Sequence, residues 1–186
     1  MQVSKTALAG VVVIEPDVHR DARGFFLETY HETQYMDAGL EDRFVQDNHS
    51  RSSRNVLRGL HLQVHHPQGK LVRVVNGVVW DVAVDIDPLS VTFKKWYGVE
   101  LSGENYRQLY IPPSYAHGFV VLSEQADLVY KCTAFYAPGD EVGILWNDPE
   151  LGIDWPVREP ILSDRDAANI SLARYVEEFH SDLDGG

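Results

Sequence analysis

Short β-type runs separated by turn signals constrain the fold of this chain more than any other feature. The runs are residues 11–15, 25–30, 56–63, 70–75, 78–86, 94–101, 107–111, 118–122, 128–135 and 142–146. Asn76-Gly77, between two valine-rich runs, is a strong signal for a two-residue hairpin. In the run that follows, apolar side chains alternate with Asp81 and Asp85, as in a strand with two different faces. About ten strands at this spacing predict a sandwich, jelly roll or barrel.

Helical signals are few. Residues 31–39 predict a short helix that ends at Gly39, and Asp164 is a candidate N-cap for a turn through residues 166–169. Residues 171–179 predict an amphipathic C-terminal helix. Residues 180–186 are polar, and we expect a frayed tail there. Because no repeat or linker divides the 186 residues, we expect a single domain spanning residues 1–186.

The composition indicates a globular protein of a reducing compartment. A hydrophobic fraction of 44% is enough for a packed core. No apolar run approaches the roughly 18 residues that cross a membrane, and the first residues lack the apolar region of a signal peptide. The single cysteine, Cys132, cannot form an internal disulfide. We therefore expect no membrane partner and a cytoplasmic location.

The net charge of −12 argues against a nucleic-acid partner, because phosphate backbones are bound by basic surfaces. It remains compatible with a small phosphorylated ligand. Arg23, Arg51, Arg54 and Arg58 are then a candidate anion site, with ordinary surface cations as the alternative.

His61 and Lys70 lie on two adjoining predicted strands and are the first candidates for chemistry. Strand alternation puts His61 and Gln63 on one face, and Lys70 on the same face as Val72. Histidine is the usual general base near neutral pH, and a fixed lysine stabilises a developing oxyanion. The pair therefore suits removal of a proton beside a ketone, although a lone strand histidine is often a satisfied core residue.

A metal site is a weaker interpretation of the same residues. Many β-barrels hold iron or manganese with an H-x-H…E…H set, and His61, Lys70 and His117 follow that rhythm. Gln63, however, stands where the second histidine belongs, and Lys70 stands near the place of the carboxylate. Because an ammonium has no lone pair and repels a metal ion, we expect no metal site and no metal cofactor.

Tyr130 and Asp166 complete the set of candidate catalytic residues. Alternation puts Tyr130 on one face with Leu128 and Cys132, from which a phenol can deliver a proton opposite a histidine. A tyrosine packed in the core is the alternative. Asp166 could orient His61 and support its imidazolium, as in other His–Asp pairs. The residues alone do not choose between Asp166 and three other candidates, which are Asp81, Asp85 and Asp164.

A known family carries these motifs in the same order. The motifs are residues 21–28, 44–50, 56–63, 68–72, 81–85, 111–119, 130–133, 147–149 and 162–166. In them the chain closely resembles the dTDP-4-dehydrorhamnose 3,5-epimerases, cupin-fold isomerases that act on sugar nucleotides. The resemblance covers about residues 5–170 and implies a cupin-type jelly roll with a few short helices, including a C-terminal one.

The resemblance implies an activity and a role for each site residue. His61 removes the protons at C3 and C5 of dTDP-4-dehydro-6-deoxy-D-glucose, with Asp166 as its partner. Lys70 stabilises the enolate at the C4 oxygen, and Tyr130 returns a proton on the opposite face of the ring. Further residues implied to bind the substrate are Arg23 and Arg58 at the diphosphate, Glu28, Gln46 and Asn48 at the nucleotide and sugar, Tyr136 on the thymine ring, and His117, Glu141 and Arg165 in the rest of the pocket.

The resemblance also implies a homodimer that exchanges or shares strands and uses no metal or redox cofactor. The product is then dTDP-4-dehydro-L-rhamnose, an intermediate of L-rhamnose biosynthesis. Relatives that epimerise only C3 or only C5 retain the same histidine and lysine, so partial epimerisation in a secondary-metabolite pathway stays open. A non-catalytic cupin that binds sugar nucleotides is the alternative from another class.

Overall fold

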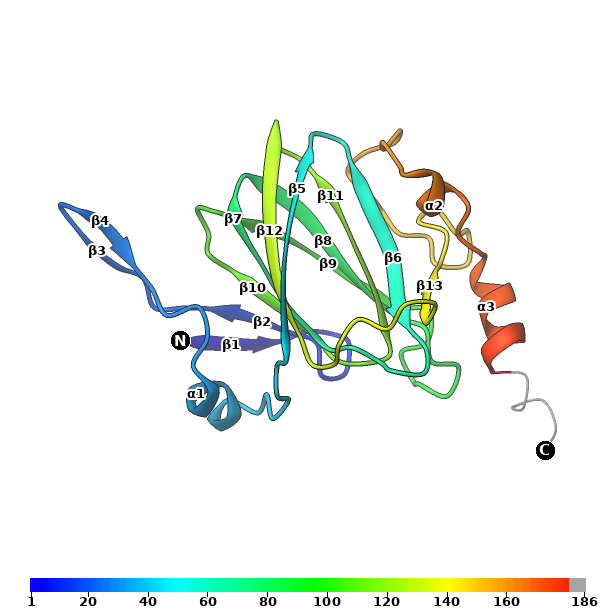
Figure 1. The fold of residues 1–186 in the computed structure, drawn as a ribbon, viewed down its shortest axis with the longest axis horizontal. Helices are drawn as coiled ribbons and strands as arrows, with labels where there is room; N and C mark the ends of the chain where they lie inside the picture. The colour runs from blue at the N-terminus through cyan, green and yellow to red at the C-terminus, as the bar shows by residue number, and fades with distance from the viewer. Residues whose placement is uncertain (181–186) are drawn as a thin grey trace.

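The computed structural model describes residues 1–180, and two antiparallel sheets form most of it (Figure 1). The strands of the six-stranded sheet, in spatial order, are β1 (Gln2–Lys5), β2 (Val12–Glu15), β10 (Gln108–Ile111), β7 (Lys70–Asn76), β12 (Gln125–Cys132) and β5 (Gln46–Ser53). Those of the five-stranded sheet are β13 (Glu141–Gly143), β6 (Leu57–Gln63), β11 (Tyr115–Val121), β8 (Val78–Asp85) and β9 (Trp96–Ser102). The packed sheets confirm the expected mainly-β jelly-roll sandwich.

The main hydrophobic core lies between the two sheets. Val72 and Leu109 from the six-stranded sheet and Val79 and Val121 from the five-stranded sheet are fully buried in it. Each stands on the inward-facing side of its strand, so the alternation in the sequence becomes one apolar layer. Removal of these side chains from water is the main force that holds the sheets together.

Three helices lie on the outer faces of the sandwich or beside it: α1 (Glu32–Asp37), α2 (Asp164–Ala167) and α3 (Leu172–Phe179). The predicted first and last helices are confirmed, and α3 packs Leu172 and Tyr175 against the five-stranded sheet. The predicted N-cap of α2 was wrong by one residue, because Ser163 accepts the N–H of Asp166. Residues 181–186, where we expected a frayed tail, lie outside the described residues. None of the helices in residues 1–180 has the length and apolar character needed to cross a membrane.

Strand β5 was missed in the sequence because its residues, Gln-Asp-Asn-His-Ser-Arg-Ser-Ser, show no apolar alternation. The strand lies at the edge of its sheet, and within residues 1–180 it pairs only with β12. Its inward side chains line a polar cavity, so they need not be apolar. The short strands β1 and β3 (His19–Asp21) were also missed.

A hairpin of β3 and β4 (Gly24–Phe26) forms an arm that projects away from the sandwich (Figure 1). The predicted strand at residues 25–30 was therefore too long at its end, because the chain leaves the hairpin after Phe26. Phe25 and Phe26 are 54% and 67% exposed. The arm thus exposes two large apolar side chains on its second strand, and Phe25 also packs against Tyr106.

Candidate active site

A polar cavity of about 490 Å³ opens between the two sheets. It is lined by Gln46, Asn48, Ser50, Arg58, His61, Gln68, Lys70, His117, Phe119, Tyr130, Tyr136, Glu141, Ser163, Arg165 and Asp166. All four predicted catalytic residues are in this set, as are seven of the nine predicted substrate-binding residues. Residues from strands of both sheets, from α2 and the Ser163 before it, and from two loops thus converge on one space.

His61, which is half-buried, and Asp166, which is buried, form a pair in the wall of the cavity. The His61 ring nitrogen Nε2 lies 2.5 Å from Oδ1 of Asp166, and the Ser163 hydroxyl donates to Oδ2 at 2.9 Å. Burial alone raises the pKa of the Asp166 carboxyl, but the bond and charge of His61 together with Ser163 lower it below its usual value. The carboxylate therefore stays charged beside His61, and Nδ1 is the ring nitrogen directed away from it.

The approach of Asp166 to His61 depends on how the chain enters α2. Ile161 forms a parallel bridge with Val56, with Leu57 N donating to Ile161 O at 3.0 Å and Ile161 N to Asn55 O at 2.8 Å. These bonds attach the segment before α2 to the start of β6, the strand that carries His61. The segment before α2 thereby brings Asp166 to His61. Of the four candidate aspartates, Asp166 is the one that partners His61.

Asp81, one of those other candidates, partners a second histidine instead. His117 Nε2 lies 2.9 Å from Oδ1 of Asp81, and Asp81 is fully buried. Oδ2 of Asp81 has no hydrogen-bond partner within the described residues. The cavity is therefore bordered by two His–Asp pairs, one on β6 and α2 and the other on β11 and β8.

Lys70 lies in the cavity wall at the start of β7. Burial lowers the pKa of its ammonium, while the nearby groups of Cys132, Glu141 and Asp81 act in the opposite direction. A cation held in a partly dry cavity interacts more strongly with a developing anion than one in bulk water.

Tyr130 lies on β12 next to β7, with Val72 and Asn48 opposite it on the neighbouring strands. Burial raises the pKa of its phenol, and the acidic groups of Cys132 and Glu141 raise it further. The positive charge of Arg58 acts in the opposite direction. The phenol therefore stays protonated at neutral pH and can act as a donor. The predicted alternation is confirmed, because Lys131 on the other face binds Asp47 outside the sandwich.

A chain of side-chain amides borders the cavity along β5. The Tyr136 backbone N–H donates to Gln46 Oε1 at 2.9 Å, Gln46 Nε2 to Asn48 Oδ1 at 3.1 Å, and Asn48 Nδ2 to Cys132 Sγ at 3.4 Å. On the opposite rim, Arg165 forms an ion pair with Glu141 at 2.6 Å. These polar groups suit a ligand with several hydrogen-bonding groups.

Arg58 reaches the cavity because β6 does not alternate strictly. Arg58 and His61 are three positions apart, yet both line the cavity. Between them Gly59 has a φ of 121°, and pairing with β11 shifts register between His117 and Phe119. A β-carbon on Gly59 would lie 2.6 Å from the Gly118 α-carbon, so only glycine fits at this irregularity.

Two predicted substrate-binding residues, Arg23 and Glu28, do not line the cavity. Arg23 lies in the arm, with its side chain 90% exposed and paired with Asp21. Glu28 accepts a hydrogen bond from Gln34 at 3.3 Å. The broader arginine cluster is not assembled either, because Arg51 pairs with Asp127 and only Arg58 of the four lines the cavity.

Four cavity residues were not among the predicted site residues: Ser50, Gln68, Phe119 and Ser163. Each lies inside or beside one of the motifs, at residues 44–50, 68–72, 111–119 and 162–166. Their proximity to the motifs was the only available signal, since nothing in their residue types points to chemistry. Within the described part of the chain, no group of three or more His, Cys, Asp or Glu side chains is arranged to hold a metal ion.

Comparison with known proteins identifies the family. The model of the dTDP-4-dehydrorhamnose 3,5-epimerase family matches residues 5–174. The chain belongs to this family. An epimerase of that name from Pseudomonas aeruginosa is 54% identical over 175 residues, which cover 93% of this chain and 97% of the relative. The family assignment confirms the prediction of an isomerase of the epimerase class.

Relatives in this epimerase family extend the comparison to structure and to specificity. A crystal structure of the Legionella pneumophila 3,5-epimerase in complex with dTDP-4-keto-L-rhamnose superposes with a TM-score of 0.92 at 50% identity, covering 96% of each chain. A Streptomyces niveus relative named dTDP-4-dehydrorhamnose 3-epimerase is 39% identical over 175 residues, covering 93% of this chain and 84% of that protein. The family thus includes members whose names differ in the carbon atoms on which they act.

Proposed function

We propose that this epimerase converts dTDP-4-dehydro-6-deoxy-D-glucose to dTDP-4-dehydro-L-rhamnose by inverting C3 and C5. The observation that carries the proposal is the convergence of His61, Asp166, Lys70 and Tyr130 on one cavity. A site that only binds a sugar nucleotide needs no acid–base pair beside a half-buried cation. Membership of the 3,5-epimerase family supports the substrate class.

In the proposed reaction His61 removes a proton α to the C4 ketone. Such a proton is weakly acidic, so the enolate must be stabilised by several kcal/mol for the reaction to be fast. Lys70 supplies this stabilisation at the C4 oxygen. Asp166, charged and 2.5 Å from His61, keeps the ring oriented and stabilises the imidazolium that forms.

Inversion then requires a proton donor on the opposite face of the sugar ring. Tyr130 comes from β12 of one sheet and His61 from β6 of the other, so the two side chains border the cavity from different sheets. The protonated phenol delivers the proton to the enolate carbon. Before the second α-carbon reacts, His61 must release its proton to solvent, the Tyr130 phenolate must take one up, and the ring must shift in the cavity. The chemistry requires neither a metal nor a redox cofactor.

The remaining cavity residues bind the nucleotide and the sugar in this proposal. Arg58 contacts the diphosphate with its planar fork of donors, and Tyr136 stacks on the thymine ring. Gln46, Asn48, His117, Glu141 and Arg165 complete the polar lining of the same cavity.

Arg23 and Glu28 do not line the cavity of their own subunit, which supports a role for them in a homodimer. Arg23 lies on an arm that projects from the sandwich and exposes Phe25 and Phe26 (Figure 1). We propose that the arm of each subunit completes the cavity of its partner and adds Arg23 to the diphosphate site. The proposal also takes residues 1–186 as one epimerase domain and places the enzyme in the cytoplasm.

Proton NMR in deuterium oxide tests the proposed function. With dTDP-4-dehydro-6-deoxy-D-glucose, deuterium should enter at both C3 and C5, and a reductase should trap the L-lyxo ketosugar. Exchange at one carbon only would support a partial epimerase, the alternative favoured by the 3-epimerase relative from Streptomyces niveus. Exchange at neither carbon would contradict the catalytic proposal.

A further inference from the structure

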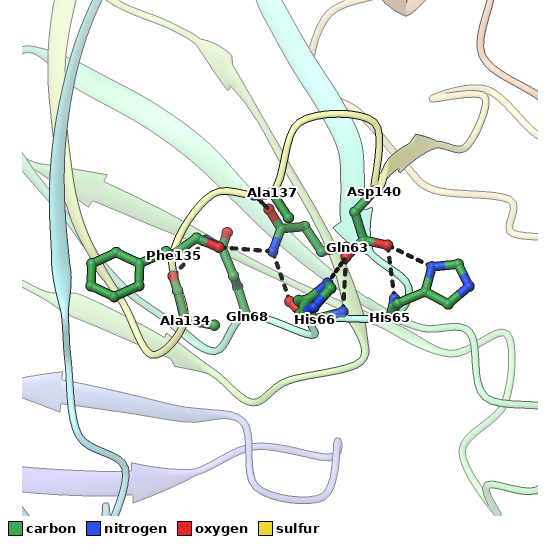
Figure 2. A network of polar contacts seen from close by, with 8 residues as sticks. All are labelled: Gln63, His65, His66, Gln68, Ala134, Phe135, Ala137 and Asp140. Carbon is green, nitrogen blue, oxygen red and sulfur yellow. Dashed lines mark hydrogen bonds and ion pairs between the residues drawn. The ribbon is translucent and has the colours of Figure 1, made fainter.

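Two loops beside the cavity are joined by partly buried hydrogen bonds that the proposed reaction does not use (Figure 2). The first loop, residues 64–69, connects β6 to β7 and therefore links His61 to Lys70. The second loop, residues 133–140, connects β12 to β13 and carries Tyr136. Each loop contributes one residue to the cavity wall, Gln68 and Tyr136.

Gln63 lies at the centre of this network. It shares the His61 face of β6, but its side chain is only 3% exposed because the second loop covers it. Its Nε2 donates to the backbone oxygens of His66 at 2.7 Å and Phe135 at 3.2 Å, and its Oε1 accepts the N–H of Ala137 at 2.8 Å. One carboxamide thus uses both donors and its acceptor to join the two loops.

The bonds of Gln63 flank Tyr136. Phe135 immediately precedes Tyr136 and Ala137 immediately follows it, while the N–H of Tyr136 itself donates to Gln46 at 2.9 Å. The Tyr136 side chain is 48% exposed, so packing of the ring contributes little to its position. The position of the ring therefore depends on the backbone bonds around it.

Two further residues stiffen the same loops. Gln68 Nε2 donates to the backbone oxygen of Ala134 at 2.7 Å. Asp140 accepts the backbone N–H groups of His65 and His66 at 2.9 and 2.8 Å, and its oxygens also lie 2.7 and 3.1 Å from their Nδ1 atoms (Figure 2). Gln63 differs from both because it alone contacts the residues on either side of Tyr136.

We propose that Gln63 is a positioning residue for the nucleotide: it joins the two loops and thereby holds Tyr136 at the thymine end of the cavity. The inference rests on the proposed function, in which Tyr136 stacks on the base. Gln63 does not touch the substrate in this proposal. Loss of the Gln63 carboxamide leaves partly buried backbone groups of both loops without this partner, so the second loop becomes less ordered in the free protein. Substrate binding must then supply the free energy that orders the loop.

Calorimetric titration with dTDP tests this inference. Gln63→Leu, of similar size but without polar atoms, should weaken dTDP binding by about tenfold, roughly the effect of one net hydrogen bond. KM should rise accordingly, with kcat within about twofold of wild type, because binding rather than chemistry is affected. In a Tyr136→Ala background the same substitution should have little further effect, since coupled residues are not additive.

Gln63→Glu adds a second readout, the pH dependence of dTDP affinity, which a general loss of stability does not produce. It keeps the acceptor for Ala137 but loses both donors, so its dTDP affinity should be low at neutral pH. Protonation of the introduced carboxyl restores one donor, so the deficit should narrow as the pH falls. This variant also keeps the inference testable if Gln63→Leu does not fold.

Ser123→Ala is the matched control. Its hydroxyl accepts Val78 N–H at 2.8 Å and donates to Gln125 O at 2.7 Å, so it joins two turns that do not line the cavity. This variant should lower the melting temperature without changing dTDP affinity. The inference would be overturned, with the proposed function intact, if Gln63→Leu bound dTDP as tightly as wild type. It would also be overturned if Gln63→Leu lowered dTDP affinity by the same factor in the Tyr136→Ala background as in the wild type. Failure of the wild-type protein to bind dTDP would overturn the proposed function and the inference with it.

Discussion

His61 and Asp166 are 105 positions apart in the chain, and their side chains meet at 2.5 Å in the wall of the cavity. The bond joins β6 of the five-stranded sheet to α2, which follows the last strand. A base and its orienting carboxylate thus come from two segments that fold against each other. The pair provides the first test of the mechanism.

Asp166→Asn should lower kcat by roughly 10³- to 10⁴-fold, the loss seen when the carboxylate of a His–Asp pair is neutralised. The amide cannot stabilise the imidazolium and favours the wrong ring tautomer. Steady-state kinetics with the ketosugar, beside calorimetry with dTDP, separates this effect from a binding defect. A loss of less than about tenfold would show that Asp166 does not support the base.

His61→Ala should abolish deuterium incorporation at both C3 and C5 while dTDP still binds. The reason is that one base serves both carbons in the proposed reaction. The measurement is proton NMR in deuterium oxide, with His180→Ala as a histidine control, because His180 follows α3 and does not line the cavity. Persistent exchange at either carbon would assign the base to another residue, with His117 and its Asp81 partner as the first alternative.

Tyr130→Phe should slow net inversion more than it slows proton removal. Burial keeps the phenol protonated, so its proposed task is to donate on the face opposite His61. General-acid catalysis contributes about 10²- to 10⁴-fold, which sets the size of the expected loss in inversion. Solvent exchange and product formation should be followed in one sample. If both fall equally, Tyr130 shapes the cavity and is not the acid.

Protonation of Asp140 should make the folded protein less stable at acid pH. Burial raises the pKa of its carboxyl, but the N–H groups and rings of His65 and His66 outweigh this and hold it well below the unfolded value of 3.8. Because the folded pKa is depressed, the stabilisation is complete above about pH 4–5 and is lost as the pH falls further.

Asp140→Asn should therefore lower the melting temperature at pH 6 and flatten its decline between pH 5 and pH 2. Thermal unfolding followed by circular dichroism at several pH values measures both effects. Asp154→Asn, at an exposed position, should leave the curve unchanged. A variant curve parallel to that of the wild type would mean that Asp140 does not titrate across the transition.

Mixed dimers test the arm. Arg23→Ala and His61→Ala should each be inactive alone. If the arm completes the partner's cavity, random mixing should restore about one quarter of wild-type activity, because half of the dimers then hold one intact site. Light scattering should show a dimer throughout. Without any recovery on mixing, Arg23 would act within its own subunit, and an active Arg23→Ala dimer would show that Arg23 has no role.

The candidate site shows which side-chain positions strand alternation can predict and which it cannot. Strand alternation placed Tyr130 and Lys70 on inward faces correctly, because side chains of a strand alternate whatever the sheet packs against. The same rule could not place Arg58 in the cavity with His61, since the irregular pairing at Gly59 depends on the opposite strand, β11. For β5, the rule had no apolar pattern to detect.

By itself the sequence determined the mainly-β class, the family and the residue types of the chemistry, because these follow from local periodicity and from motifs in order. Only the tertiary structure decided which aspartate meets which histidine: Asp166 with His61, and Asp81 with His117. It also decided that Arg23 lies on an arm outside its own cavity and that Gln63 joins two loops. Such relationships arise from contacts between segments far apart in the chain, and a local pattern contains no information about the distance between their side chains.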